Sequence, residues 1–405
     1  MLIYRTKEGD TLSSVARRHG ILPTVLAEAN GLVPDAPLTV GEALILRHVR
    51  ETATAREGDT PMSLARRHHI RPYRLLQLNP SLAFGTVPYD GMRIALSTEE
   101  PSRGSLSVLG FLHPATERKE YLPLLPFLSY LALLGWRLDK EGKVTPPEDG
   151  EAVRAARENG VVPLAVLTAE QNMPLSALLG KGDVSAEGLS ASLRERGYGG
   201  VVLDLGEVSE ECLPDYTAFL GTLRRRLGHT FLIMATLPPR KGALDLRCRT
   251  LGRAAGALLL ETHAIASRFS LPSPEAPYDE VLALAAEASG LLRPQKLFLG
   301  LSTRALDFPV NGGAGRVIPP SEVRRRCERG QVSYDPAARV PYLAYREGEE
   351  ERVLFFEDAE SLHEKLALVE RYGFGGIALH PLVGTDIRVL GMLAELFRIV
   401  KPYGG

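Results

Sequence analysis

The stretch from Gly200 to Glu207 joins an apolar run to two carboxylates, side chains that are suited to acid–base chemistry. The run Val201-Val202-Leu203 predicts a buried strand that ends in polar residues. Because side chains alternate faces along a strand, Asp204 and position 206 face one side and Glu207 faces the other. Position 206 is a glycine, so a second carboxylate joins Asp204 only if a bulge at Gly206 turns Glu207 inward.

Further histidines and carboxylates stand near the ends of other apolar runs, namely His113, Asp204, His263 and His380, with Glu207 and Glu261 nearby. Such side chains can hold a metal ion or support a metal-assisted hydrolysis. They share no ligand-spacing motif, and the alternative is a set of polar side chains that line a cavity. We predict no metal and no cofactor, and keep a metal-dependent hydrolase as an alternative.

The elements that precede these residues form an internal repeat. Residues 8–11 recur unchanged as residues 57–60, and residues 14–19 recur with one exchange as residues 63–68 at the same offset. Each copy predicts a strand, two helices and a strand. An Asp or Thr caps the first helix, and Asn30-Gly31 or Asn79-Pro80 ends the second.

The repeat resembles the LysM module over the whole length of each copy, from Tyr4 through Gly31 to Ile45 in the first. LysM modules bind chains of N-acetylglucosamine in a groove between the loop after the first strand and the loop after the second helix. The resemblance implies one groove formed by Gly9, Asp10, Thr11, Leu12, Asn30, Gly31 and Leu32, and a second formed by Gly58, Asp59, Thr60, Pro61, Asn79, Pro80 and Ser81. In the second groove, Pro61 replaces the usual aliphatic residue. The alternative is that the Asp residues only cap helices and the Asn residues only end them.

The remaining chain predicts a (β/α)₈ barrel, because short apolar runs alternate with longer amphipathic stretches. The expected strands are 107–112, 128–133, 162–168, 200–205, 231–237, 257–261, 296–302 and 375–380. Helices are expected at 214–227, 279–289 and 359–372. The domain prediction is LysM modules at 1–48 and 50–98, a polar linker at 99–105 and the barrel at 106–405, with a small α+β insertion at about 309–357.

The layout resembles the cortex-lytic glucosaminidases of spore-forming bacteria, in which two LysM modules precede a barrel of glycoside hydrolase family 18. Residues 197–200, 296–301, 356–359 and 372–376 carry this resemblance. It implies substrate-assisted hydrolysis. In that reaction a Glu protonates the glycosidic oxygen, and an Asp two residues earlier orients the substrate's acetamido group. Asp204 matches the Asp, whereas Gly206 occupies the position of the Glu.

Other positions at the expected barrel mouth also depart from the family pattern. Thr262 stands in place of a Tyr that binds the acetamido oxygen, and His380 in place of the Trp that supports the sugar ring. His263 follows Thr262, and Asp307 lies in the run 304–308, which keeps one aromatic residue where the family pattern has three. We therefore predict a degenerate, inactive barrel. The alternative is an active glucosaminidase that uses Glu207 with Asp204.

Composition excludes several classes of protein. The chain has 48 basic and 49 acidic residues, a balance that argues against binding nucleic acid. No apolar stretch approaches the roughly 20 residues of a membrane span. The first residues lack the pattern of a signal peptide. We expect the partner to be peptidoglycan or another N-acetylglucosamine polymer, and the location to be the spore envelope or the cell wall.

Overall fold

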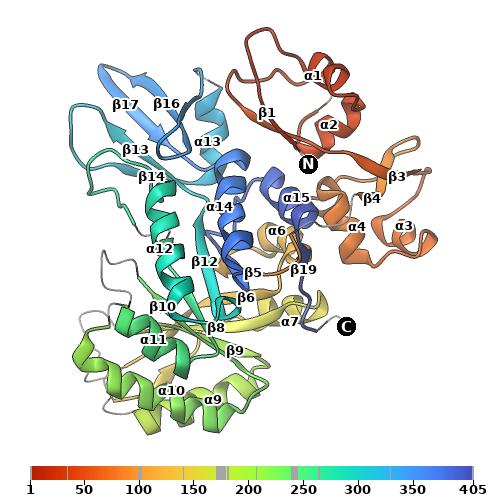
Figure 1. Ribbon diagram of the computed structural model, residues 1–405. Helices are drawn as coiled ribbons and strands as arrows, with labels where there is room; N and C mark the ends of the chain where they lie inside the picture. The colour runs from red at the N-terminus through yellow and green to blue at the C-terminus, as the bar shows by residue number, and fades with distance from the viewer. Residues whose placement is uncertain are drawn as a thin grey trace.

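The computed structural model describes residues 2–33, 35–98, 103–139, 141–169, 179, 182–206, 208–238, 245–262, 265–328 and 330–403. Two small N-terminal units, drawn in red and orange, lie beside the C-terminal helices of a larger barrel (Figure 1). A separate antiparallel sheet lies beside the first unit, at the upper left of the view (Figure 1). In the described part of the chain, no helix has the length and apolar character needed to cross a membrane.

The first unit has the predicted strand–helix–helix–strand order. Its elements are β1 (Leu2–Arg5), α1 (Leu12–Arg18), α2 (Pro23–Ala29) and β2 (Ala43–Leu46), with β1 antiparallel to β2. The helix α1 begins at Thr11 because the Thr11 and Ser14 side chains each accept the other's backbone N–H. Leu12 and Val15 on α1 pack with Leu26 of α2 in a small core of their own.

The second unit repeats this arrangement with one added turn of helix. It consists of β3 (Val49–Thr54), α3 (Pro61–Arg67), α4 (Pro72–Leu78), α5 (Pro80–Ala83) and β4 (Arg93–Thr98), with β3 antiparallel to β4. Thr60 and Ser63 form the same reciprocal cap as in the first unit. Pro61 occupies the first turn of α3, a position where its missing N–H has no partner to lose.

The larger unit is the predicted barrel of eight parallel strands. In order around the barrel these are β5 (Ser105–Leu112), β6 (Tyr130–Leu138), β8 (Val162–Ala169), β9 (Gly200–Asp204), β10 (Leu232–Leu237), β11 (Ala257–Leu260), β12 (Leu297–Ser302) and β18 (Gly376–His380). The pairing of β18 with β5 and of β5 with β6 closes the ring. All eight strands fall on the predicted apolar runs. The short strands β7 (Val144–Thr145) and β19 (Arg398–Ile399) add to its edges.

Helices cover the outer face of the barrel (Figure 1). They are α6 (Arg118–Tyr121), α7 (Gly150–Glu158), α9 (Gly182–Glu195), α10 (Leu213–Leu227), α11 (Asp245–Ala254), α12 (Tyr278–Leu291), α14 (Ala359–Tyr372) and α15 (Ile387–Leu396), with short 3₁₀ helices at η1 (Leu122–Phe127), η2 (Glu210–Cys212) and η4 (Pro294–Lys296). The helix α14 illustrates why these segments are helical. Asp358 caps its first turn, and Gly373 ends it in the left-handed conformation.

The inward face of the barrel follows from the alternation of side chains along each strand. Val202, Met234 and Leu259 pack together in the interior core. Two residues further along, the same face carries Asp204 on β9, Thr236 on β10 and Glu261 just beyond β11. The carboxyl ends of the strands therefore bring polar side chains to the barrel mouth, where barrel proteins place their sites.

The insertion after β12 is a five-stranded antiparallel sheet with one helix. It contains β13 (Ala305–Pro309), β14 (Arg316–Ile318), α13 (Pro320–Cys327), β15 (Ser333–Asp335), β16 (Val340–Glu347) and β17 (Glu350–Phe355). The sheet order is β14-β13-β17-β16-β15. The sheet thus begins at Ala305, which places Asp307 inside it.

Candidate functional site

Asp204 ends β9 at the barrel mouth, with its side chain partly exposed. Thr236 on the neighbouring strand β10 donates a hydrogen bond from Oγ1 to the Asp204 carboxylate, 3.4 Å away, and the backbone N–H of Gly206 donates another. Burial raises the pKa of Asp204, and these two donors oppose that rise by stabilising the charged form. Asp204 is therefore held as a hydrogen-bond acceptor that faces the mouth.

Glu261 is a second carboxyl at the same mouth. It follows β11 directly, and its backbone N–H donates to the carbonyl of Leu237 at 3.1 Å. Burial, followed by the negative charge of Asp204, raises the pKa of Glu261 to about 8. The neutral acid is consequently the main form of Glu261 at neutral pH.

The structure corrects the predicted role of Thr262. Thr262 is fully buried and donates its hydroxyl to the backbone carbonyl of Gly300, so it does not face the mouth. Strand alternation from the inward Leu259 makes Glu261 the inward residue instead. The sequence predicted that Thr262 would be the inward residue after β11, one position beyond Glu261. His263, which was predicted to lie at the mouth, is outside the described residues.

His380 ends β18 at the mouth, as predicted, and is partly exposed. Burial and the nearby charge of Arg304 lower the pKa of His380 to about 4, so its imidazole is neutral at neutral pH. Its ring meets that of Phe111 edge-on at 5.5 Å. Beside it, Ser302 and Arg304 both bind the carboxylate of Glu275, with Arg304 Nε at 2.8 Å.

Asp307 was predicted at the barrel mouth, and this placement is wrong. It is fully buried in the insertion sheet, where it forms ion pairs with Arg316 at 2.7 Å and Arg352 at 3.1 Å. Tyr345 also donates to it at 2.9 Å. Asp307 therefore holds β13, β14, β16 and β17 together and takes no part in the mouth.

The position of the family's acid, residue 206, is a glycine with a φ of +75°. Nothing lies within 4 Å of where a Cβ would stand there. The strand β9 has already ended at Asp204, so regular alternation no longer fixes the direction of the following side chains. Glu207 itself lies outside the described residues. Across the described residues, no group of three or more His, Cys, Asp or Glu side chains is placed to hold a metal ion.

In the first module, the polar residues of the predicted groove have partners within the module. Asp10 accepts hydrogen bonds from Tyr4 at 2.6 Å, from the backbone of Lys7 at 2.8 Å and from Arg18 at 3.0 Å. Asn30 is buried and links the end of α2 to β2 by three bonds to backbone groups of Leu26 and Ile45. These side chains therefore shape the two loops of the predicted groove.

The remaining groove positions of the first module divide between surface and core. Gly9 and Thr11 are exposed, whereas the Leu12 and Leu32 side chains are buried in the module. Gly31 lies against the barrel, because a Cβ at that position would stand 2.6 Å from Cγ2 of Ile387 at the start of α15. The loop after α2 is therefore partly covered by the barrel.

The second module uses its matching residues in the same way. Asp59 accepts from the backbone of Arg56 at 2.8 Å and pairs with Arg67, and buried Asn79 bonds Leu75 and Ala95. Gly58 and Thr60 are exposed, and Pro61 is partly exposed. Pro80 is buried at the start of α5 beside α15, and Ser81 donates to Glu28 of the first module at 3.1 Å.

Sequence reasoning missed a group of exposed apolar side chains on the second module. Phe84, Val87 and Tyr89 stand on the loop between α5 and β4, and Tyr89 is 61% exposed. Met62, at the start of α3, is also exposed. The signal was present in the sequence as aromatic and aliphatic residues in a turn-rich segment, where burial is not expected.

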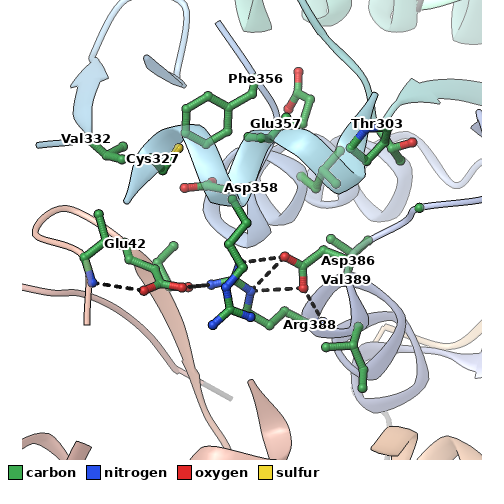
Figure 2. A pocket seen from close by; sticks show the side chains of 18 of the residues that line it. Glu42, Thr303, Cys327, Val332, Phe356, Glu357, Asp358, Asp386, Arg388 and Val389 are labelled. Atoms are coloured by element: carbon green, nitrogen blue, oxygen red, sulfur yellow. Dashed lines mark hydrogen bonds and ion pairs between the residues drawn. The ribbon is translucent and has the colours of Figure 1, made fainter. Parts of the chain in front are cut away.

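Two cavities lie away from the barrel mouth, where the first module meets the rest of the chain. One, of about 270 Å³, is enclosed by the first module, α13, α14 and α15. Figure 2 shows Arg388 reaching between Asp386 of the barrel and Glu42 of the first module, at 2.6 Å and 2.7 Å. The second, of about 930 Å³, opens between the loops of the first module and residues 330–332 of the insertion. The first cavity therefore lies where Arg388 connects the first module to the barrel.

The comparison with known families first defines the class of protein. The LysM domain model matches residues 4–47 and 53–97, and these are the two N-terminal units. The chain therefore carries two LysM domains ahead of a closed parallel barrel.

Known relatives then extend the likeness to the whole chain. The cortical fragment-lytic enzyme of Bacillus anthracis is 25% identical over 435 residues, which cover 98% of this chain and 99% of that protein. The crystal structure of the Bacillus cereus spore cortex-lytic enzyme SleL matches with a TM-score of 0.79 at 20% identity, over 99% of both chains. A chitinase from Chromobacterium violaceum matches with a TM-score of 0.66 at 17% identity, over 72% of this chain and 98% of that one. The predicted resemblance is confirmed, and the barrel has a chitinase-like fold.

Proposed function

We propose that this protein binds the N-acetylglucosamine-containing glycan of peptidoglycan through its LysM domains, and that its barrel does not cleave glycan by the substrate-assisted route. The two LysM domains and the similarity to cortex-lytic enzymes support peptidoglycan as the partner. The same similarity supports the spore envelope as the location. Two weak sites on one chain gain apparent affinity when a polymer can engage both.

The observation that carries the second part of the proposal is the glycine at position 206. Asp204 is in place with its hydrogen-bond donors, but two residues later there is no side chain to protonate a leaving oxygen. General acid catalysis typically contributes about 10²–10⁴-fold to a rate. A barrel without that acid should therefore turn over N-acetylglucosamine polymers near the background rate.

The test combines a binding assay with a cleavage assay on the full chain. The purified protein should co-sediment with insoluble peptidoglycan, and the same sample should release no soluble fragments that mass spectrometry can detect. The variant for comparison has the exposed residues Thr11 and Thr60 both changed to Asp, which can still cap α1 and α3. Because these side chains stand at the predicted grooves, sedimentation should fall by about tenfold with the fold retained. Unchanged sedimentation of this variant would remove the LysM domains as the binding sites.

A second candidate function is favoured by one feature of the backbone. Since β9 ends at Asp204 and Gly206 has a positive φ, strand alternation stops at residue 204 and sets no direction for the side chain at position 207. An active glucosaminidase that uses Glu207 as its acid is the resulting alternative. Cleavage by the wild-type chain that is lost in Glu207→Gln, while thermal stability is kept, would establish this alternative and overturn the proposal of an inactive barrel.

A further inference from the structure

The cleft of about 930 Å³ beside the first LysM domain is lined by two loops of that domain and by the insertion. Residues 5–8 and 36–42 belong to the loops that also carry the predicted glycan groove, and residues 324–332 provide the facing wall. The backbone N–H of Lys7 in the cleft donates to the carboxylate of Asp10 in the groove at 2.8 Å. The cleft and the groove therefore adjoin each other along the loop after β1.

The base of the cleft is a fixed contact between the first domain and the insertion. The backbone N–H of Val332 donates to the carbonyl of Val40 at 3.0 Å. Gly41 permits this approach, because its φ is +85° and a Cβ there would stand 2.0 Å from the carbonyl oxygen of Val332. The Arg5 guanidinium lies over the ring of Tyr334, 4.6 Å from its centroid, and adds a second contact. The two walls are therefore held at a set separation before any ligand arrives.

Four exposed charged side chains on these walls make no hydrogen bond or ion pair with another residue that the structure describes. They are Lys7, Glu8, Arg324 and Glu328. Each wall thus carries one positive and one negative charge. The remaining charged groups of the lining, Arg5 and Glu42, already pair with Asp358 and Arg388. The cleft therefore offers two cations and two carboxylates to a ligand that has charges of both signs.

We propose that this cleft binds the peptide stem of peptidoglycan while the adjoining groove holds the glycan. The stems carry free carboxylates and free amino groups, whereas a polymer of N-acetylglucosamine alone carries neither. Lys7 and Arg324 pair with the carboxylates of the stem, and Glu8 and Glu328 pair with its ammonium groups. This inference rests on the proposed function, because a stem is brought to the cleft by the glycan strand to which it is attached.

The experiment uses the full chain and two forms of one peptidoglycan tetrasaccharide, one with its peptides and one from which an amidase has removed them. Isothermal titration calorimetry gives the Kd of each form. For the wild type we expect the form with peptides to bind about threefold to tenfold more tightly, a range that a few exposed ion pairs can supply. Because salt screens exposed charges, this preference should largely disappear at roughly 1 M sodium chloride.

A double variant and a matched control locate the effect. Lys7→Gln combined with Arg324→Gln removes both positive charges, so the two forms should bind with Kd values within about twofold of each other. Its Kd for the peptide-free form should stay that of the wild type. Arg325→Gln is the control, because Arg325 is exposed on the same helix and does not line the cleft. This control should keep the preference, and both proteins should melt within about 1 °C of the wild type.

The outcomes separate this inference from the proposed function. Equal affinity of the wild type for the two forms, or a preference that the double variant retains, overturns the peptide site and leaves the proposed function standing. Loss of the preference in Arg325→Gln as well would show a general effect of charge and would also overturn the site. If the wild type binds the form with peptides but not the peptide-free form, the cleft is supported and glycan binding by the groove is contradicted. If neither form binds, both proposals fail.

Discussion

Gly206 combines a left-handed backbone with open space, and the two properties have separable effects. A residue with a Cβ pays about 1 kcal/mol or more at a φ of +75°, whatever its side chain. Since nothing lies within 4 Å of a Cβ at this position, no steric term is added. The positive φ alone therefore favours glycine at position 206, and crowding by neighbouring atoms contributes nothing.

This leads to a prediction for two substitutions at one site. Gly206→Ala and Gly206→Glu should both lower the free energy of unfolding by about 1 kcal/mol, as measured by urea denaturation. Gly206→Glu should not gain hydrolysis, because the backbone there is no longer that of a strand. Gly188→Ala, at an exposed site in α9, is the matched control and should stabilise by up to about 1 kcal/mol. A cleaving Gly206→Glu variant would contradict this account.

The sequence could predict the residue types at the mouth but not all of their directions. Asp204 and His380 lie where the strand pattern predicted them. The prediction placed Thr262 at the mouth, where the structure has Glu261. The error arose because a shift of one residue at the end of a strand reverses which side chain faces inward. Asp307 was misplaced, because a sequence pattern does not show that a buried carboxylate will be matched by Arg316 and Arg352 from distant strands.

At the scale of elements, the loop between α5 and β4 presents apolar side chains that the folded module does not bury. Phe84 and Tyr89 project from a loop whose ends are fixed by buried Asn79, which bonds α4 to β4. Aromatic rings suit the apolar faces of sugar rings. This loop follows α5, whose first residues Pro80 and Ser81 belong to the predicted groove.

We therefore predict that Tyr89→Ala weakens peptidoglycan binding by roughly threefold to tenfold in quantitative sedimentation. Because the side chain is largely exposed, the melting temperature should stay within about 1 °C of the wild-type value. Tyr403→Ala, at another exposed tyrosine near the C-terminus, should leave binding unchanged. If both variants bind equally to the wild type, the loop is not part of the binding surface.

The strands of the barrel were predictable for a physical reason. A parallel strand that is covered on both faces needs a near-continuous apolar run, and runs such as 297–302 show this directly. The repeat likewise predicted both small modules from local caps and stops. The packing of Gly31 against Ile387 was not predictable, because no local pattern records which surfaces of two separate units will meet.

At the scale of the whole molecule, Arg388 joins the first LysM domain to the barrel. Its side chain is only 11% exposed, pairs with Asp386 at 2.6 Å, and donates to Glu42 at 2.7 Å and to the carbonyl of Ala43 at 3.1 Å. Arg5 adds a second connection, to Asp358 at 3.0 Å. Removing one partner of a buried ion pair leaves an uncompensated charge and typically costs about 3–5 kcal/mol.

Arg388→Met should accordingly release the first domain from the barrel without unfolding the barrel itself. Hydrogen–deuterium exchange of residues 41–46 should accelerate by at least about tenfold, while exchange in β12 stays as in the wild type. Arg346→Met, an exposed position on β16, should change neither region. Equal exchange at residues 41–46 in both variants would show that Arg388 does not hold the domain in place.

The contacts that hold the first LysM domain against the barrel also fix the orientation of its predicted groove relative to the barrel. A glycan has two chemically different ends, and a groove of L-amino acids fits it in only one of the two orientations. On a free tether, the bound strand could still leave the groove at any angle to the barrel. Because Arg388, Arg5 and the packing of Gly31 fix the domain, a groove that binds glycan as proposed would hold the strand at one angle to the barrel. The barrel would then have the same orientation relative to every strand that the protein binds.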